Sequence, residues 1–267
     1  MTGASPSGRS SSLVADERGS PTSSTTVFIH GAGVGSWMWR GQLTAVPDLH
    51  CLVLDLPGHG QNHSMPWTSI PELAGQIADL IRDRTHGGRA HIVGLSLGAV
   101  IGLELVANHP DVVDRAMLTG LLGTGIPGAG MFAGMTRALM PLARLRPMIS
   151  MTARALKVPA EDRNSLANEV NRLDGKLVAQ VFLEVAAFRP PSVLAQRTNP
   201  VLILAGSREY QGILATVRTL LALLPNGAGG LVPAGIHTWN WQFPDLFNRM
   251  LRDWLIDHRV PEGLLQP

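Results

Sequence analysis

The sequence predicts an α/β fold in which helices flank both faces of a mostly parallel sheet. Two observations predict this class. Short apolar runs rich in Val, Ile and Leu alternate with longer segments of helical periodicity, which is the pattern of βαβ units. Several of these runs are apolar almost without interruption, as in strands that are buried on both faces of a parallel sheet. The predicted strands cover residues 27–29, 51–56, 91–93, 116–119, 200–205 and 231–232.

In chain order, the elements form a leader and then a core in two parts. Residues 1–26 are dominated by Ser, Thr, Gly and Pro, so we expect a flexible leader with room for a short edge strand. The core is expected over residues 27–120 and 199–267. Its most clearly marked helix follows Ser69, because Ser69 and Glu72 form a capping box.

Between the two parts of the core, residues 121–198 are helical in pattern and contain no clear strand. Because this segment follows the strand that ends near residue 119, we expect a helical cap over the carboxyl edge of the sheet, where ligands bind in open α/β sheets. Arginines of the segment could mark a helix that lies on a membrane surface, although a solvated face is the favoured interpretation. These arginines are Arg137, Arg144, Arg146 and Arg154.

Composition excludes several classes of protein. The formal charge of the 267-residue chain is only +2, and no basic cluster is dense enough to predict nucleic-acid binding. Charged residues interrupt the long apolar stretches, so we expect no membrane insertion. Cys51 is the single cysteine, which excludes an intrachain disulfide and a cysteine-based metal site. With no secretory segment in the sequence, a cytoplasmic location is expected.

The junction between the strand at 91–93 and the following helical pattern reads Gly94-Leu95-Ser96-Leu97-Gly98, a G-x-S-x-G sequence. A strand that turns this sharply into a helix holds its apex residue in a strained conformation and needs small neighbours. We therefore expect Ser96 to present its hydroxyl at the carboxyl edge of the sheet, at the positive end of a helix dipole.

Serine is a poor nucleophile unless a base activates it, and the base needs an orienting carboxylate. Glu209 and His237 each lie just beyond a predicted strand, on the same edge as Ser96, and the order Ser, acid, His is the one expected for a nucleophile elbow. Asp55 and His59 offer another acid–base pair, but a strand-end Asp beside a glycine-rich turn more often binds local backbone N–H groups.

On these motifs the chain resembles an α/β-hydrolase-fold serine hydrolase from residue 27 onward. HGAG at His30, DLPGHG at Asp55, GLSLG at Gly94, G-x-x-E at Gly206 and GIH at Gly235 follow the family's order. The resemblance implies an oxyanion hole made by the backbone N–H groups of Ala32 and Leu97. It is weaker toward the methylesterase and hydroxynitrile-lyase branch. The chain departs from the family pattern in two features: the leading β-hairpin is absent or reduced, and Glu takes the place of the commoner Asp as the triad acid.

The resulting prediction is a carboxylesterase that cleaves small to medium apolar esters through an acyl-enzyme, with a small-molecule substrate and neither a metal nor an organic cofactor. A lactonase, a hydrolase of C–C bonds and a ligand receptor with slow turnover are the alternatives. The oligomeric state is left open. We expect the substrate pocket to be lined by Gly33, Trp37, Met131, Met135 and Trp239, although Trp37 could anchor its helix and the methionines could pack inside the cap.

Overall fold

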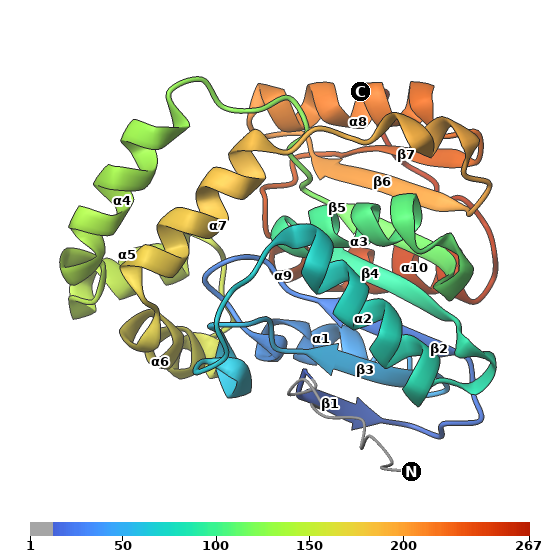
Figure 1. The fold of residues 1–267 in the computed structure, drawn as a ribbon, viewed down its shortest axis with the longest axis horizontal. Coiled ribbons are helices and arrows are strands. Elements are labelled where there is room, and N and C mark those ends of the chain that lie inside the picture. Colours follow the sequence, from blue (N-terminus) through green and yellow to red (C-terminus); the bar gives the residue numbers. More distant parts are fainter. Residues whose placement is uncertain (1–12) are drawn as a thin grey trace, which may run out of the picture.

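The computed structural model describes residues 13–267, and within them seven strands form one sheet in the order β1-β3-β2-β4-β5-β6-β7 (Figure 1). All neighbouring pairs are parallel except β1 with β3, which is antiparallel. The strands are β1 (Ala15–Arg18), β2 (Thr25–Ile29), β3 (His50–Leu54), β4 (Ala90–Leu95), β5 (Val113–Thr119), β6 (Val201–Gly206) and β7 (Gly227–Val232).

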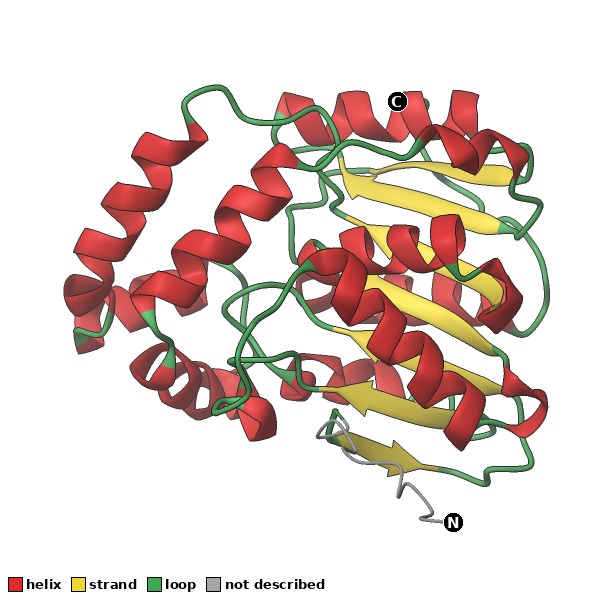
Figure 2. Ribbon diagram, viewed as in Figure 1, coloured by secondary structure: helices red, strands yellow, loops and turns green. Residues whose placement is uncertain are grey.

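Helices cover both faces of this sheet, as the uninterrupted apolar strands predict. Strand β2 shows the alternation: Val27 and Ile29 pack in one core cluster, and Phe28 packs in the other. The first cluster includes residues of α2 (Ile70–Arg84), α3 (Leu97–Asn108) and α8 (Gln211–Leu223). The second includes residues of α9 (Trp239–Gln242) and α10 (Pro244–Leu255), with α1 (Arg40–Leu43) and its preceding 3₁₀ turn beside them. Figure 2 shows α2 and α3 in front of the sheet.

The capping box that marks the start of α2 is present, because Ser69 Oγ accepts a hydrogen bond from the Glu72 N–H at 3.3 Å. The amino-terminal segment contains the short edge strand for which the sequence analysis left room within residues 1–26. Ala15–Arg18 forms edge strand β1 against β3, and Thr25 already begins β2. Backbone pairing with β3 provides the order that side-chain composition alone does not predict. Residues 1–12 lie outside the described part of the chain.

Between β5 and β6 the chain forms four helices that lie beyond the carboxyl ends of the parallel strands (Figure 1). They are α4 (Ala129–Ala143), α5 (Arg146–Ala155), α6 (Arg163–Arg172) and α7 (Gly175–Ala187). We call residues 121–198 the helical insert. Helix α4 packs on α7, and in Figures 1 and 2 α4 is the helix farthest from the sheet. Among the described residues, no helix combines the length and the apolar character needed to cross a bilayer.

Candidate active site

Ser96 is the single residue between the end of β4 and the start of α3. Its backbone has φ 57° and ψ −113°, a sparsely populated combination for a residue with a side chain. The flanking glycines are required sterically: a Cβ at Gly98 would lie 2.1 Å from the Ile29 carbonyl oxygen, and one at Gly94 would lie 2.3 Å from the Gly98 oxygen. The strain at Ser96 is therefore held in place by close backbone packing on both sides of it.

The loop after β2 lies against this turn. A Cβ built on Gly31 would be 3.4 Å from the Ser96 Cβ, so Ala32, the next residue, is part of the loop that faces the serine. Leu97 is the first residue of α3, where a backbone N–H has no partner within its own helix. The two N–H groups expected to form an oxyanion hole thus belong to segments that meet at Ser96.

His237 and Glu209 form a direct pair. The Nδ1 of His237 lies 2.5 Å from Oε2 of Glu209, and the Glu209 side chain is almost fully buried while that of His237 is 36% exposed. The second carboxylate oxygen, Oε1, accepts the Gly206 N–H at 2.8 Å. With Nδ1–H donated to the carboxylate, the Nε2 of His237 is the nitrogen that can accept a proton.

Backbone packing holds this pair in register, because the two loops that carry it touch. The Arg208 N–H donates to the Gly235 carbonyl at 2.9 Å, and the Ala234 N–H donates to Ser207 Oγ at 2.9 Å. These hydrogen bonds between the loops hold Glu209 and His237 close together independently of the hydrogen bond between their side chains.

The end of β5 connects the pair to the serine turn. The Ser96 N–H donates to the Thr119 carbonyl at 2.9 Å. The next residue, Gly120, has φ +68°, and a Cβ there would lie 2.7 Å from Cε1 of His237. Sequence reasoning missed Gly120, because the pattern of the chain does not show which distant side chain a glycine meets. The signal available was a glycine placed directly after a strand at the same edge as Ser96.

His30 and His59 lie near this edge but are bound differently. His30 donates from Nδ1 to the Gly31 carbonyl at 2.7 Å, and its Nε2 accepts the Leu56 N–H at 2.9 Å. His59 donates from Nδ1 to the Pro57 carbonyl at 3.0 Å, and its Nε2 accepts the Gly33 N–H at 3.1 Å. Both rings organise loop backbone.

Burial fixes the charge of these two histidines. Desolvation lowers the pKa of His30 to about 4 and that of His59 to about 3, and the neighbouring His30 ring also lowers the latter. Asp55 and His59 are not hydrogen-bonded to each other as an acid–base pair in the structure. Asp55 instead accepts the Ser36 N–H at 2.7 Å and the Gln61 N–H at 2.9 Å.

The residues expected to line a substrate pocket do not gather in one place. Trp239 is fully buried, packs on Phe247 with ring centroids 4.5 Å apart and donates to Thr119 Oγ1 at 2.8 Å, so it belongs to the core. Met131 and Met135 are 73% and 50% exposed on α4, which reaches away from the sheet. For Trp239 the prediction was wrong, and Met131 and Met135 do not share a pocket with it, because periodicity shows which residues share a face and not what that face meets.

Gly33 and Trp37 lie in or directly after the loop that follows β2 and faces Ser96. Gly33 belongs to the loop that contains Ala32, and its N–H is bound by His59. Trp37 is half-buried and stacks on Trp241 with ring centroids 5.6 Å apart. The stacking agrees with the alternative in which Trp37 anchors its own short helix.

A small apolar hollow of about 380 Å³ lies against the helical insert, and its wall contains neither Ser96, Glu209 nor His237. Its wall includes Tyr210, which directly follows Glu209, and two aromatic residues of the insert, Phe132 and Phe182, with Ile126 and Pro127. None of these side chains is charged. The hollow suits an apolar group of a few carbons better than an ionic one.

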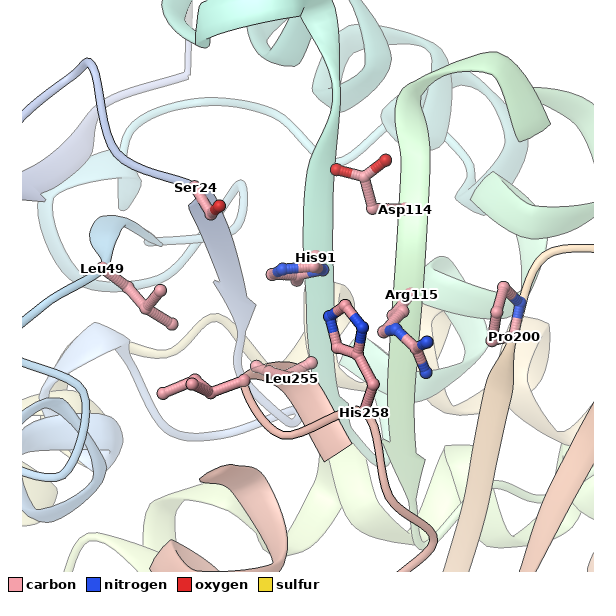
Figure 3. A pocket seen from close by; sticks show the side chains of 9 residues that line it. Ser24, Leu49, His91, Asp114, Arg115, Pro200, Leu255 and His258 are labelled. Atoms are coloured by element: carbon pink, nitrogen blue, oxygen red, sulfur yellow. The ribbon is translucent and has the colours of Figure 1, made fainter. Parts of the chain in front are cut away.

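Another hollow, of about 460 Å³, lies at the opposite edge of the sheet (Figure 3). It is lined by His91, Asp114, Arg115 and His258, among others. His91 is near the start of β4 and Ser96 follows its end, so the whole strand separates this hollow from the serine. Across residues 13–267 no group of three or more His, Cys, Asp or Glu side chains is arranged to hold a metal ion.

Comparison with known families gives one match over most of the chain. Residues 26–257 match the model of the Alpha/beta hydrolase family. A curated relative, the 2-hydroxy-6-oxononadienedioate/2-hydroxy-6-oxononatrienedioate hydrolase of Cupriavidus pinatubonensis, is 27% identical over 252 residues, which are 86% of this chain and 86% of that protein.

Solved structures share the fold at lower identity. A thermophilic esterase from Thermogutta terrifontis superposes with a TM-score of 0.74 at 18% identity, covering 93% of this chain and 94% of the esterase. The enol-lactonase from Burkholderia xenovorans gives a TM-score of 0.71 at 21% identity, covering 91% of this chain and 96% of the lactonase. The predicted fold class is confirmed by these likenesses together with the family match.

Proposed function

The chain belongs to the alpha/beta hydrolase family, and from that premise we propose that it is a serine carboxylesterase for small to medium apolar acyl groups. The observation that carries this proposal is the meeting of three elements. Ser96 occupies a strained turn, and its N–H donates a hydrogen bond to the Thr119 carbonyl. The next residue, Gly120, has no side chain and so leaves room for the ring of His237. That ring is bound in turn to the buried carboxylate of Glu209.

In the proposed reaction Ser96 Oγ attacks the ester carbonyl while Nε2 of His237 takes the serine proton. The imidazolium that forms is stabilised by Glu209 through Nδ1–H. The proton then passes to the departing alkoxide, an alcohol leaves, and the acyl group remains on Ser96. Water, activated by the same histidine, releases the carboxylic acid and restores the serine.

Charge on the tetrahedral intermediate is stabilised, in this proposal, by the N–H groups of Ala32 and Leu97. Each such donor is typically worth ~3 kcal/mol in the transition state. The chemistry needs no metal and no organic cofactor. We propose that the acyl chain extends toward the hollow at Tyr210, whose uncharged wall suits an apolar chain better than a dicarboxylate. We also propose that the enzyme works in the cytoplasm, since its single thiol, Cys51, is buried and cannot form an intrachain disulfide.

The test is the hydrolysis of p-nitrophenyl esters from acetate to laurate by the wild-type protein and by Ser96→Ala, with Ser64→Ala as the exposed control. We expect a maximum at one acyl length, loss of activity in Ser96→Ala and full activity in Ser64→Ala. Activity that survives in Ser96→Ala would overturn the assignment of the nucleophile.

Labelling of the serine and assays with other substrates separate the alternatives. Labelling of Ser96 by a fluorophosphonate, together with no turnover of any ester, would overturn the esterase proposal. Turnover of lactones would then indicate a lactonase, and cleavage of 2-hydroxy-6-oxononadienedioate, the compound in the name of the Cupriavidus relative, would indicate a C–C hydrolase. Tight binding of such compounds without turnover would indicate a receptor.

A further inference from the structure

Helix α4 is apolar on both of its sides, although only one side is covered. Ala133 and Met140 are buried against the rest of the insert, whereas Met131, Met135 and Leu142, on the other side, are 73%, 50% and 54% exposed. Arg137 is the only charged residue between Ala129 and Ala143. A helix that is apolar all round normally lies in a protein core or in lipid, so the outer side of α4 needs a partner.

The exposed apolar surface continues into α5. Seven of the twelve large apolar side chains that are exposed in the described residues fall between residues 131 and 151. This set, which we call the insert's apolar surface, consists of Met131, Phe132, Met135, Leu139, Leu142, Leu145 and Met151. The five members on α4 recur at helical spacing and share one side of it, and a gathering of exposed apolar side chains of this kind marks an interaction site.

The charge of the same segment is of one sign. From residue 115 to residue 160 the sequence contains no Asp or Glu, and within residues 121–160 it contains five basic residues. All five are exposed, and none is in an ion pair among the described residues. They are Arg137, Arg144, Arg146, Arg154 and Lys157.

Apolar side chains among unpaired cations complement the surface of an anionic bilayer, where the former enter the acyl boundary and the latter meet lipid phosphates and carboxylates. A second copy of this chain is disfavoured as the partner. A two-fold interface would bring the cationic segments of both copies into one contact, with no acid from residues 115–160 to compensate.

We propose that α4 and α5 dock on the surface of membranes that contain anionic lipids, with the insert's apolar surface in the interface and without crossing the bilayer. This use of the helices does not depend on the esterase chemistry. It replaces the interpretation of the arginines as a solvated face, because the sequence did not reveal that the apolar residues between them are exposed.

The test is co-sedimentation of the full chain with vesicles of phosphatidylcholine alone and of phosphatidylcholine with phosphatidylserine. We expect binding to the anionic vesicles, weaker binding to the neutral ones, and a fall in binding as salt is raised. The double variant Leu139→Ser with Leu142→Ser should lower the partition coefficient roughly tenfold or more, because two apolar side chains are lost from the interface.

Matched control variants test whether binding depends on the insert's apolar surface or on any exposed apolar or basic residue of the protein. Val14→Ser with Val260→Ser removes exposed apolar groups elsewhere and should leave binding unchanged. Arg146→Gln with Arg154→Gln, both on α5, should weaken binding by about fivefold for each charge, whereas Arg218→Gln with Arg249→Gln, on α8 and α10, should not. All of these positions are exposed, and equal melting temperatures would show that the variants are folded.

Three results would overturn the proposal. The first is no binding to either kind of vesicle. The second is equal binding to neutral and anionic vesicles, or an equal loss in the control variants. The third is a dimer in light scattering that Leu139→Ser with Leu142→Ser dissociates, because the apolar surface would then belong to a contact between two copies.

Discussion

Two pairs of side chains near the same edge of the sheet contain histidine, and they differ in every property that matters for proton transfer. His237 is 36% exposed and bound to a carboxylate, Glu209. His30 and His59 are buried, their rings are 5.0 Å apart, and their nitrogens bind backbone groups. The residue type is the same, so the partners and the access to solvent decide the role.

The difference follows from hydrogen-bond capacity. In the His30–His59 pair both Nε2 atoms already accept a backbone N–H, so protonating either ring would break a bond that orders a loop. In His237 the Nδ1–H is used by Glu209, and that carboxylate stabilises the added charge. One arrangement favours a change of protonation and the other prevents it.

The largest expected effect is on the pair that can change protonation and on its serine. Ser96→Ala and His237→Ala should each lower kcat/KM by roughly 10⁴-fold or more, since the members of a triad act as a unit. The measurement is steady-state kinetics on the best p-nitrophenyl ester, with the exposed His63→Ala as the control. Near-normal kcat/KM in His237→Ala would contradict the role of His237 as the base, which is what distinguishes it from His30 and His59.

Replacing the acid should cost less. Glu209→Gln keeps the base and loses its orientation and charge, so we expect a fall in kcat of roughly 10²-fold to 10⁴-fold. Glu262→Gln, at an exposed position, is the control. If Glu209→Gln retained full kcat, another acid would orient His237 and the carboxylate would not be what separates the two pairs.

Gly120→Ala tests whether position alone matters for His237. The added Cβ would lie 2.7 Å from Cε1 of the ring at a residue with φ +68°, so the ring must move. We expect kcat to fall roughly tenfold to a hundredfold, as for a small misplacement of a reacting group. Gly263→Ala is the matched control, because Gly263 has φ +79° and no atom within 4 Å of the Cβ position. An equal loss in both variants would point to backbone strain instead.

A smaller effect on activity is expected for the buried pair. His59→Ala leaves the Gly33 N–H without its acceptor, which should lower the free energy of unfolding by about 1–3 kcal/mol. We expect kcat/KM to fall by no more than roughly tenfold, because the loop is loosened while the base is intact. The two readouts are urea unfolding and steady-state kinetics. A loss of kcat/KM as large as in His237→Ala would give His59 a direct part in the chemistry.

The mildest effect is on the dependence of stability on pH. Burial lowers the pKa of His30 to about 4 and that of His59 to about 3, against 6.5 in the unfolded chain. Between these values the unfolded chain binds more protons, so the free energy of unfolding should fall as the pH falls below about 6.5. The slope is at most about 1.4 kcal/mol per pH unit for each histidine.

Urea unfolding at pH 7 and pH 5 measures this slope, and His59→Asn should make it shallower while the exposed His63→Asn should not. An unchanged slope in His59→Asn would mean that His59 titrates normally in the folded protein. Its burial would then not separate it from His237.

Much of the fold could be predicted from the pattern of the chain. The strand before Ser96 was expected over residues 91–93 and is observed as Ala90–Leu95, and the helix expected after the capping box at Ser69 begins at Ile70. Local signals sufficed because a buried parallel strand and an amphipathic helix each have a periodicity of their own. The edge strand β1 escaped prediction as a definite element, because its partner β3 is more than thirty residues away.

The sequence by itself determined the parallel strands of the core, their order along the chain and the residue types that can do acyl chemistry at Ser96, Glu209 and His237, because these depend on local spacing and chain order. Tertiary structure decided the rest. It placed Gly120 against His237, enclosed Trp239 in the core and turned Met131 toward solvent. Those outcomes depend on which distant surfaces meet, and a one-dimensional pattern does not contain that information.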